Sequence, residues 1–171
     1  EGRRRDRVHA ADHRGLSMLK RIAIQADDFD IGREWAELRA SLSGSAGAMA
    51  AFCGLVRDQF QSDSVHTLEL EHYPGMTERS IESVLDRAAT RWPLDALVVI
   101  HRVGSLAPGD QIVLVLATSR HRQAALDACA YVIDLLKTEA VFWKREVFGS
   151  GSRWIESTSG DHRRAADWQN S

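Results

Sequence analysis

Basic side chains suited to binding an anion or moving a proton gather at three places in the sequence. Arg57 follows an apolar stretch, and Arg120–His121–Arg122 stands before a long helical pattern. Lys137, Lys144 and Arg145 form the third cluster. Cations of this kind pair with phosphates and carboxylates through charge-assisted hydrogen bonds, and lysine also acts as a general acid or base. The three clusters are therefore the candidate sites of chemistry.

The cluster at residues 120–122 lies where a helix N-terminus is expected. Unpaired N–H groups and the positive end of the helix dipole gather there, so additional cations are unfavourable unless an anion binds. A phosphate site at this position explains the cluster. The alternative is that Arg120 and Arg122 point into solvent.

Lys144 lies on an alternating segment that predicts a strand, so its side chain shares a face with Phe142 and Glu146. A lysine beside an aromatic ring is partly desolvated, and its pKa is then adjusted for proton transfer. The alternative is a solvated strand face with a Lys144–Glu146 pair. Lys137 alone is ordinary, because a lysine in the last turn of a helix favours the dipole.

The two cysteines, Cys53 and Cys129, lie in apolar surroundings and are predicted to be buried reduced thiols. Neither belongs to a CxxC motif or a Cys/His cluster, and the seven histidines are scattered without an HExxH pattern. The sequence therefore predicts no metal site.

The chain has 171 residues, of which 44% are hydrophobic and 27% are charged, as expected for one globular domain. No apolar run approaches the ~20 residues that span a bilayer, and no secretory signal opens the chain, so we expect a cytoplasmic protein without a membrane partner.

Residues 1–17 are basic and lack apolar periodicity, which predicts a disordered extension. A nucleic-acid-binding role for this arm is disfavoured by the overall pI near 6.4 and the absence of interleaved aromatic residues.

Apolar periodicity predicts strands and helices that interleave along residues 18–157. The expected helices cover residues 31–40, with Asp30 as N-cap, and 77–91, followed by one that runs from the N-cap candidates Thr118 and Ser119 to about residue 139. The expected strands are 19–24, 48–56, 65–73, 96–103, 112–117, 142–148 and 154–156, and residues 58–64 are expected to form a mobile loop. Several strands follow one another directly, so the fold class is α+β, a mixed or antiparallel sheet with helices packed on it in a single domain. Residues 158–171 are expected to be a C-terminal tail or a final helical turn.

Short motifs follow one another in a fixed order between residues 22 and 156. They are FCGLVR (52–57), DSV (63–65), LELEHYPGMTE (68–78), RWPL (91–94), VIHRVG (99–104), PGD (108–110), TSRHR (118–122), LKT (136–138), FWKRE (142–146) and RW (153–154). In this order and number they resemble the large, catalytic subunit of molybdopterin synthase, the MoaE family.

The resemblance implies an α/β-hammerhead-like fold, a homodimer and a sulfurtransferase activity in molybdenum cofactor biosynthesis. The enzymes of this family convert cyclic pyranopterin monophosphate to molybdopterin by inserting two dithiolene sulfurs. The sulfur arrives as a thiocarboxylate on the Gly-Gly tail of a small ubiquitin-like subunit, and one small subunit docks at each end of the dimer to give a heterotetramer. No metal and no bound cofactor is implied.

The resemblance also carries over residue by residue. It implies that the substrate-binding residues are Arg57, His121, Arg122, Lys137, Lys144, Arg145 and Glu146, and that Lys137 and Lys144 are catalytic. The family often has a lysine two positions before the arginine that matches Arg57, whereas this chain has Leu55.

The length of the predicted helix limits which of these residues can contact the same substrate molecule. His121 and Lys137 are sixteen residues apart on one predicted helix, a separation of roughly 24 Å along its axis. A pterin monophosphate is shorter than that, so both residues serve one site only if two protomers build it.

A non-catalytic dimeric scaffold that binds a ubiquitin-like protein is the alternative function, but it would not need Arg57, Lys137 and Lys144 together.

Overall fold

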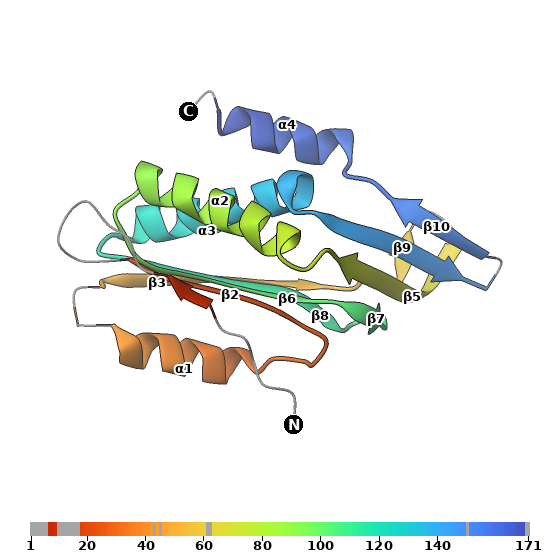
Figure 1. Ribbon diagram of the computed structural model, residues 1–171, viewed down its shortest axis with the longest axis horizontal. Coiled ribbons are helices and arrows are strands. Elements are labelled where there is room, and N and C mark those ends of the chain that lie inside the picture. The colour runs from red at the N-terminus through yellow and green to blue at the C-terminus, as the bar shows by residue number, and fades with distance from the viewer. Residues whose placement is uncertain are drawn as a thin grey trace.

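A computed structural model describes residues 7–9, 18–42, 44, 46–60, 63–149 and 151–169. Its centre is a five-stranded sheet with the order β1-β2-β6-β8-β3 (Figure 1). The strands are β1 (Arg7–His9), β2 (Leu19–Gln25), β6 (Leu94–Arg102), β8 (Gln111–Ser119) and β3 (Ala48–Leu55). Only the β2–β6 pair is parallel, so the sheet is mixed, as the sequence predicts.

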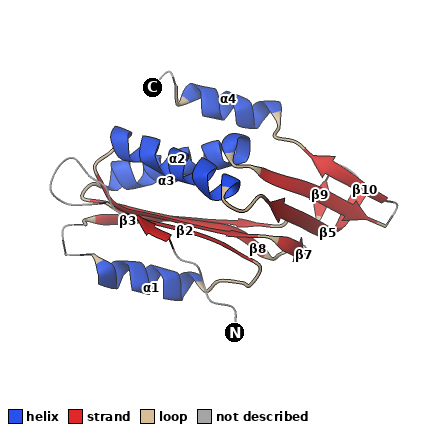
Figure 2. Ribbon diagram, viewed as in Figure 1, coloured by secondary structure: helices blue, strands red, loops and turns tan. Residues whose placement is uncertain are grey.

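Helices cover both faces of this sheet (Figure 2). On one face lie α2 (Met76–Arg91) and α3 (Arg122–Glu139), which pack on Leu97 and Val99 of β6. On the other face lies α1 (Ile31–Ser41), which packs on Ala96, Val98 and Ile100. A strand buried on both faces needs apolar residues at every position, which explains the unbroken run of residues 96–100.

A second, antiparallel sheet extends from one end of the first (Figure 1). Its order is β10-β9-β5-β4, and β7 also pairs with β5. The strands are β10 (Gly151–Ile155), β9 (Phe142–Phe148), β5 (Asp63–His72), β4 (Gln59–Phe60) and β7 (Gly104–Leu106). Strand β9 follows α3 after two residues, so the C-terminal end of the long helix leads directly into this sheet.

The last helix, α4 (Ser159–Asp167), packs on α3. The Trp168 indole N–H donates to the Asp134 carboxylate at 2.9 Å, and its ring meets those of Trp92 and Tyr131 edge to face. Residues 158–169, expected as a tail or a helical turn, therefore include an ordered nine-residue helix.

The α+β fold class and most predicted elements are confirmed. Asp30 caps α1 by accepting from the Arg33 N–H at 2.9 Å. The predicted N-caps of the long helix are wrong, because Thr118 and Ser119 end β8 and His121 occupies the N-cap position. Ser119 nevertheless accepts the His121 N–H through its hydroxyl at 3.3 Å.

Three further differences concern segments whose pairing partners are distant in sequence. Residues 58–64 include β4 and the start of β5, whereas a loop is expected there, and residues 61–62 lie outside the described part of the chain. The sequence analysis also missed β7. The expected extension over residues 1–17 lies outside the described residues except for β1, which pairs with β2. Among the described residues, no helix is both long enough and apolar enough to cross a membrane.

Thr77 joins the start of α2 to the start of β9. Its fully buried hydroxyl accepts from the Tyr73 N–H at 3.0 Å and donates to the Val141 carbonyl at 2.7 Å. Thr77→Val keeps the shape but leaves both backbone groups without this partner, so we expect it to lower the free energy of unfolding by about 1–3 kcal/mol. Urea unfolding measures this value. Thr90→Val, on the exposed face of α2, is the control and should stay within about 0.5 kcal/mol of the parent, and equal effects would contradict the role of Thr77.

Candidate active site

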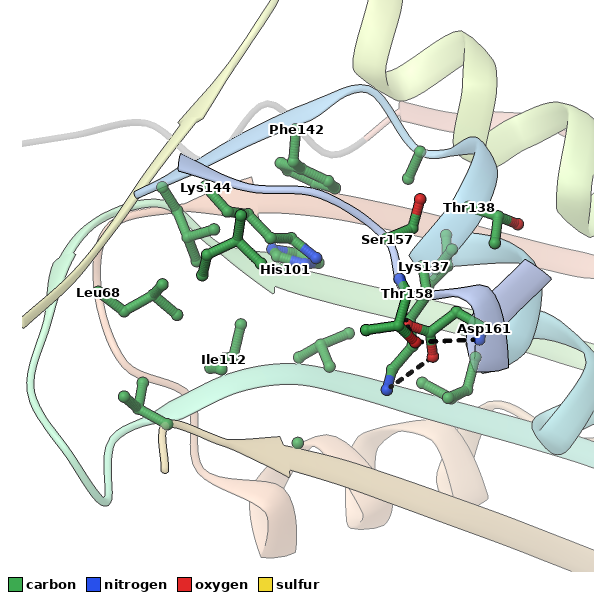
Figure 3. Close-up of a pocket in the computed structure, with 18 of the residues that line it drawn as sticks. Leu68, His101, Ile112, Lys137, Thr138, Phe142, Lys144, Ser157, Thr158 and Asp161 are labelled. Atoms are coloured by element: carbon green, nitrogen blue, oxygen red, sulfur yellow. Dashed lines mark hydrogen bonds and ion pairs between the residues drawn. The ribbon is translucent and has the colours of Figure 1, made fainter. Parts of the chain in front are cut away.

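A cavity of about 910 Å³ opens where the two sheets meet the C-terminal end of α3 (Figure 3). Its apolar wall includes Leu68 and Leu70 of β5 and Ile112 of β8. Titratable side chains enter it from separate elements. They are Cys53 of β3, Arg57 after β3, His101 of β6, Lys137 of α3, Lys144 and Glu146 of β9, Glu156 after β10, and Asp161 and His162 of α4. A mostly apolar cavity with a few convergent polar groups is typical of a small-molecule site.

Lys144 enters the cavity from β9 together with Phe142 and Glu146, which confirms the face that strand alternation predicts. Its side chain is partly buried. Burial lowers the pKa of Lys144 below its usual value, the charge of nearby Lys137 lowers it further, and Asp161 opposes both effects. The alternative Lys144–Glu146 pair is not formed, because Glu146 pairs with Arg153 at 2.9 Å. Lys144 is thus an amine that gives up its proton more readily than a solvated lysine does.

Lys137 reaches the same cavity from the last turn of α3. Its ammonium lies 3.6 Å from the carboxylate of Asp161, and half of its side chain (49%) is exposed to solvent. Figure 3 shows the two side chains facing one another at the wall formed by the start of α4. The chain has only three lysines, and two of them line this cavity while the third, Lys20, pairs with Asp86 elsewhere.

Asp161 is a site residue that the sequence analysis missed. Burial would raise the pKa of its carboxyl group, but hydrogen bonds from Thr158, together with Lys137 and Arg164, lower that pKa to about 2. Thr158 and Asp161 form a capping box at the start of α4. The T-x-x-D spacing is a recognised sign of a helix N-terminus, so the sequence did contain a signal for this ordered carboxylate.

His101 is the second residue that was missed. It lies 5% exposed at the end of β6, where its ring stacks on Phe142 with 3.9 Å between centroids. On β6 it follows Leu97 and Val99 on one face, and a histidine that continues a row of buried apolar residues is the signal.

The rim of the cavity includes Arg57, which is exposed, and Leu55, which is 55% exposed. Leu55 therefore offers an apolar surface at the rim. Cys53 also lines the cavity, and burial raises the pKa of its thiol. Burial raises the pKa of Cys129 to about 11. Both thiols are free, and Cys129 is buried as predicted, whereas Cys53 is only partly buried. Their raised pKa values make both of them poor nucleophiles.

Three of the predicted substrate-binding residues lie outside the cavity of this chain. Arg145 points to the opposite face of β9, where its Nε donates to Glu69 at 2.8 Å and its guanidinium covers the Trp154 ring. His121 and Arg122 are exposed at the N-terminal end of α3. Because α3 is one continuous helix of 18 residues, they lie roughly 24 Å from Lys137 along its axis.

The arrangement within one chain thus combines two lysines, one of them with a lowered pKa, and a cationic rim beside an apolar wall. Such a site binds an anionic, partly apolar molecule and moves protons at its reacting atoms. Within the described ranges, no group of three or more His, Cys, Asp or Glu side chains is placed to hold a metal ion.

The carboxyl group of Asp161 makes stability depend on pH. Its folded-state pKa of about 2 lies below the usual 3.8, so its stabilising contribution is present above pH 3.8 and is lost as the pH falls towards 2. We expect Asp161→Asn to destabilise the protein at neutral pH, and we expect the difference from the parent to shrink over that acidic range. Urea unfolding at several pH values measures both. Asp127→Asn, on α3 away from the cavity, serves as the control, and a difference that does not change with pH would refute the assignment.

Comparison with known proteins places this architecture in a family. A model of the MoaE protein family matches residues 24–139. The molybdopterin synthase catalytic subunit of Vibrio cholerae is 47% identical over 152 residues, which cover 89% of this chain and all of that protein. The corresponding subunit of Escherichia coli is 44% identical over 148 residues, covering 86% of this chain and 97% of that one.

Solved structures agree with the sequence relatives. The MoaE protein of Burkholderia ambifaria superimposes with a TM-score of 0.74 at 46% identity, covering 86% of this chain and 97% of that chain. Molybdopterin synthase from Staphylococcus aureus gives a TM-score of 0.71 at 28% identity, over 77% of this chain and 94% of that chain. Fold, family model and relatives matched along nearly their whole length lead to one conclusion: the chain belongs to the MoaE family.

Proposed function

We propose that this chain is the catalytic subunit of a molybdopterin synthase, a sulfurtransferase that converts cyclic pyranopterin monophosphate to molybdopterin. The observation that carries the proposal is the pair Lys137 and Lys144 in one cavity, with burial lowering the pKa of Lys144. The names of the relatives support it, since proteins 44–47% identical to this chain are molybdopterin synthase catalytic subunits.

The substrate's cyclic phosphate needs cationic partners, and its pterin needs an apolar wall. Arg57 at the rim and the two lysines supply positive charge, while Leu68, Leu70 and Phe142 supply apolar surface. The term catalytic subunit in the names of the relatives implies a second subunit. We assign that role to a small ubiquitin-like carrier whose C-terminal thiocarboxylate enters the cavity.

In the proposed reaction the thiocarboxylate sulfur attacks a side-chain carbon of the pterin and forms the new C–S bond. The C–O bond at that carbon breaks, and its oxygen leaves as water at one carbon and as the opened end of the cyclic phosphate at the other. Lys137 transfers a proton at the reacting carbons, and Lys144 stabilises the oxyanion that develops. Water then cleaves the acyl C–S bond, which leaves sulfur on the pterin and a carboxylate on the carrier. A second charged carrier repeats the step. The sulfur is delivered already activated, so the raised pKa values of Cys53 and Cys129 are no obstacle.

We further propose that the working enzyme is a homodimer with shared sites. His121 and Arg122 lie too far from Lys137 to serve the cavity of their own chain, and exposed cations at a helix N-terminus suit an anion. In the dimer they would reach the cavity of the other protomer and contact the phosphate there, while Arg145 would hold Glu69 and the aromatic surface beside the carrier's entry.

The proposal places the catalytic domain at residues 18–157 and adds α4 to it, because Asp161 contributes to the cavity wall. It also places the enzyme in the cytoplasm, since two free thiols suit a reducing compartment.

The decisive experiment is single-turnover conversion of cyclic pyranopterin monophosphate by the purified chain with a thiocarboxylated carrier. Formation of the dithiolene product supports the proposal. If substrate and carrier both bind but no product forms, the chain is a non-catalytic scaffold, and Leu55→Lys is the first variant to test for restored activity.

In the same assay we expect Lys137→Ala to lower the rate by about 10²- to 10⁴-fold, the usual contribution of a positioned acid–base group. The matched control is Lys20→Ala, which removes the one lysine outside the cavity. Light scattering should show unchanged oligomeric state in both variants. A Lys137→Ala rate equal to that of the parent would remove Lys137 from the mechanism.

Shared sites predict complementation between two inactive chains. Lys137→Ala and the double variant His121→Ala/Arg122→Ala are each expected to be inactive, but a mixed dimer holds one intact site. Refolding them together in equal amounts should restore about a quarter of the parent activity, because half of the dimers are mixed and each has one working site. If each chain builds its own site, the mixture stays inactive.

A further inference from the structure

His101 is a buried titratable side chain that the proposed reaction does not use. It lines the cavity from the end of β6, and β9 packs over it through the stacked ring of Phe142. Its neighbours on the same strand face, Leu97 and Val99, are fully buried and apolar. A leucine at this position would continue the apolar row, so packing alone does not explain why a polar imidazole is found there.

The hydrogen bond of the ring fixes its tautomer. Nδ1 lies 2.8 Å from the backbone carbonyl oxygen of Arg102. A carbonyl oxygen only accepts, so Nδ1 carries the proton and donates it, which leaves Nε2 with a free lone pair. Among the residues that the structure describes, no donor pairs with Nε2.

The imidazole is also held neutral. Burial lowers the pKa of His101 to about 3, and the charges of Lys144 and His72 act in the same direction, against the hydrogen bond to Arg102. At neutral pH the ring is therefore an acceptor in the cavity, and it adds no positive charge beside the lysines.

Lys144 is a hydrogen-bond donor on the same wall of the cavity as this acceptor. Phe142 and Lys144 alternate on one face of β9, so the strand that stacks a ring on His101 also brings the lysine to it. The two side chains interact electrostatically, and Figure 3 shows them at the same wall of the cavity.

Two of the three carboxylates that line the cavity are engaged elsewhere. Glu146 pairs with Arg153, and Asp161 pairs with Lys137 and with Arg164. The third, Glu156, is exposed to solvent. The imidazole nitrogen is thus the buried acceptor that is left for the Lys144 ammonium.

We propose that His101 is a positioning residue for Lys144, whose ammonium donates a hydrogen bond to Nε2 and is thereby held towards the reacting atoms. The catalytic consequence rests on the proposed function, whereas the contact itself does not. A neutral acceptor orients the lysine without neutralising its charge, as a carboxylate would. His101 thus fixes the direction of the ammonium and leaves its other N–H donors free to stabilise the developing oxyanion.

The chain suits a direct test because it has only three lysines. Lysine labelled with ¹³C at Cε gives three side-chain signals, which Lys20→Arg, Lys137→Arg and Lys144→Arg assign. His101→Phe keeps an aromatic ring against Phe142 and removes both nitrogens. Without the acceptor the charged form of Lys144 loses a partner, so its titration should move to lower pH while that of Lys20 stays fixed. Lys137 and Asp161 also act on Lys144, Glu146 and Glu156 line the same cavity, and His72 acts on His101. All of these groups are unchanged in this variant.

A second measurement on the folded parent does not depend on that variant. In protein labelled with ¹⁵N-histidine, the Nε2 signal of His101 should move in Lys144→Met, which removes the donor, and stay in place in Lys137→Met. His101→Gln assigns the signal. An Nε2 signal that does not respond to Lys144→Met, or a Lys144 titration that is the same in folded His101→Phe, would overturn the proposal and leave His101 as a packing residue.

Steady-state kinetics test whether His101 affects the reaction. We expect His101→Phe to lower kcat about tenfold, the equivalent of one hydrogen bond to a charged group, with KM within about twofold of the parent. An unchanged kcat overturns the positioning role. Both NMR measurements need neither substrate nor carrier, so they hold or fail independently of the sulfurtransferase proposal.

Discussion

The rigid length of α3 is the constraint on which the arrangement of the site depends. The helix is continuous from Arg122 to Glu139, so its two cationic ends are held apart and cannot approach the same small molecule. At its C-terminal end, two residues lead into β9, and this short connection brings Lys137 and Lys144 to one cavity from different elements. A longer connection would leave the second lysine free to lie elsewhere. The helix therefore both brings the two lysines together and separates them from the cluster at residues 120–122.

The electrostatics of the cavity follow from how its charges are paired. Asp161 is stabilised as a carboxylate by Thr158, Lys137 and Arg164, and Glu146 is paired with Arg153. Among the described residues no carboxylate forms an ion pair with Lys144, although Asp161 attracts it, and its side chain is partly buried. The free energy of its charged form is therefore raised relative to solvent. The neutral ring of His101 completes this environment without adding charge. The two lysines are thus in different electrostatic settings although they share one cavity, and such a difference is what separate roles in proton transfer and charge stabilisation require.

Elements with strong local signals were predictable from the sequence. The apolar stripe of α2, the Asp30 cap of α1 and the alternation around Lys144 are set by neighbours within a few residues, and the structure confirms them. Strands β4 and β7 were missed because they are short and exist only through pairing with β5. The same reason applies to the site. Arg57, Lys137 and Lys144 were found as charged clusters, but the contributions of His101 and Asp161 depend on Phe142 and on Lys137, which only the folded chain brings next to them.

The pairing of distant strands has a consequence for how fast the molecule forms. In the second sheet Val65 pairs with Phe148, and in the central sheet Leu19 pairs with Ala96 and Ala48 with Ser119. Contacts between segments so distant in sequence form slowly, because the entropy of closing the loop is lost before the contacts stabilise it. Neither sheet can be completed from local contacts alone, so we expect the chain to fold slowly for its size. The cavity needs both sheets and is complete only when the whole chain has folded.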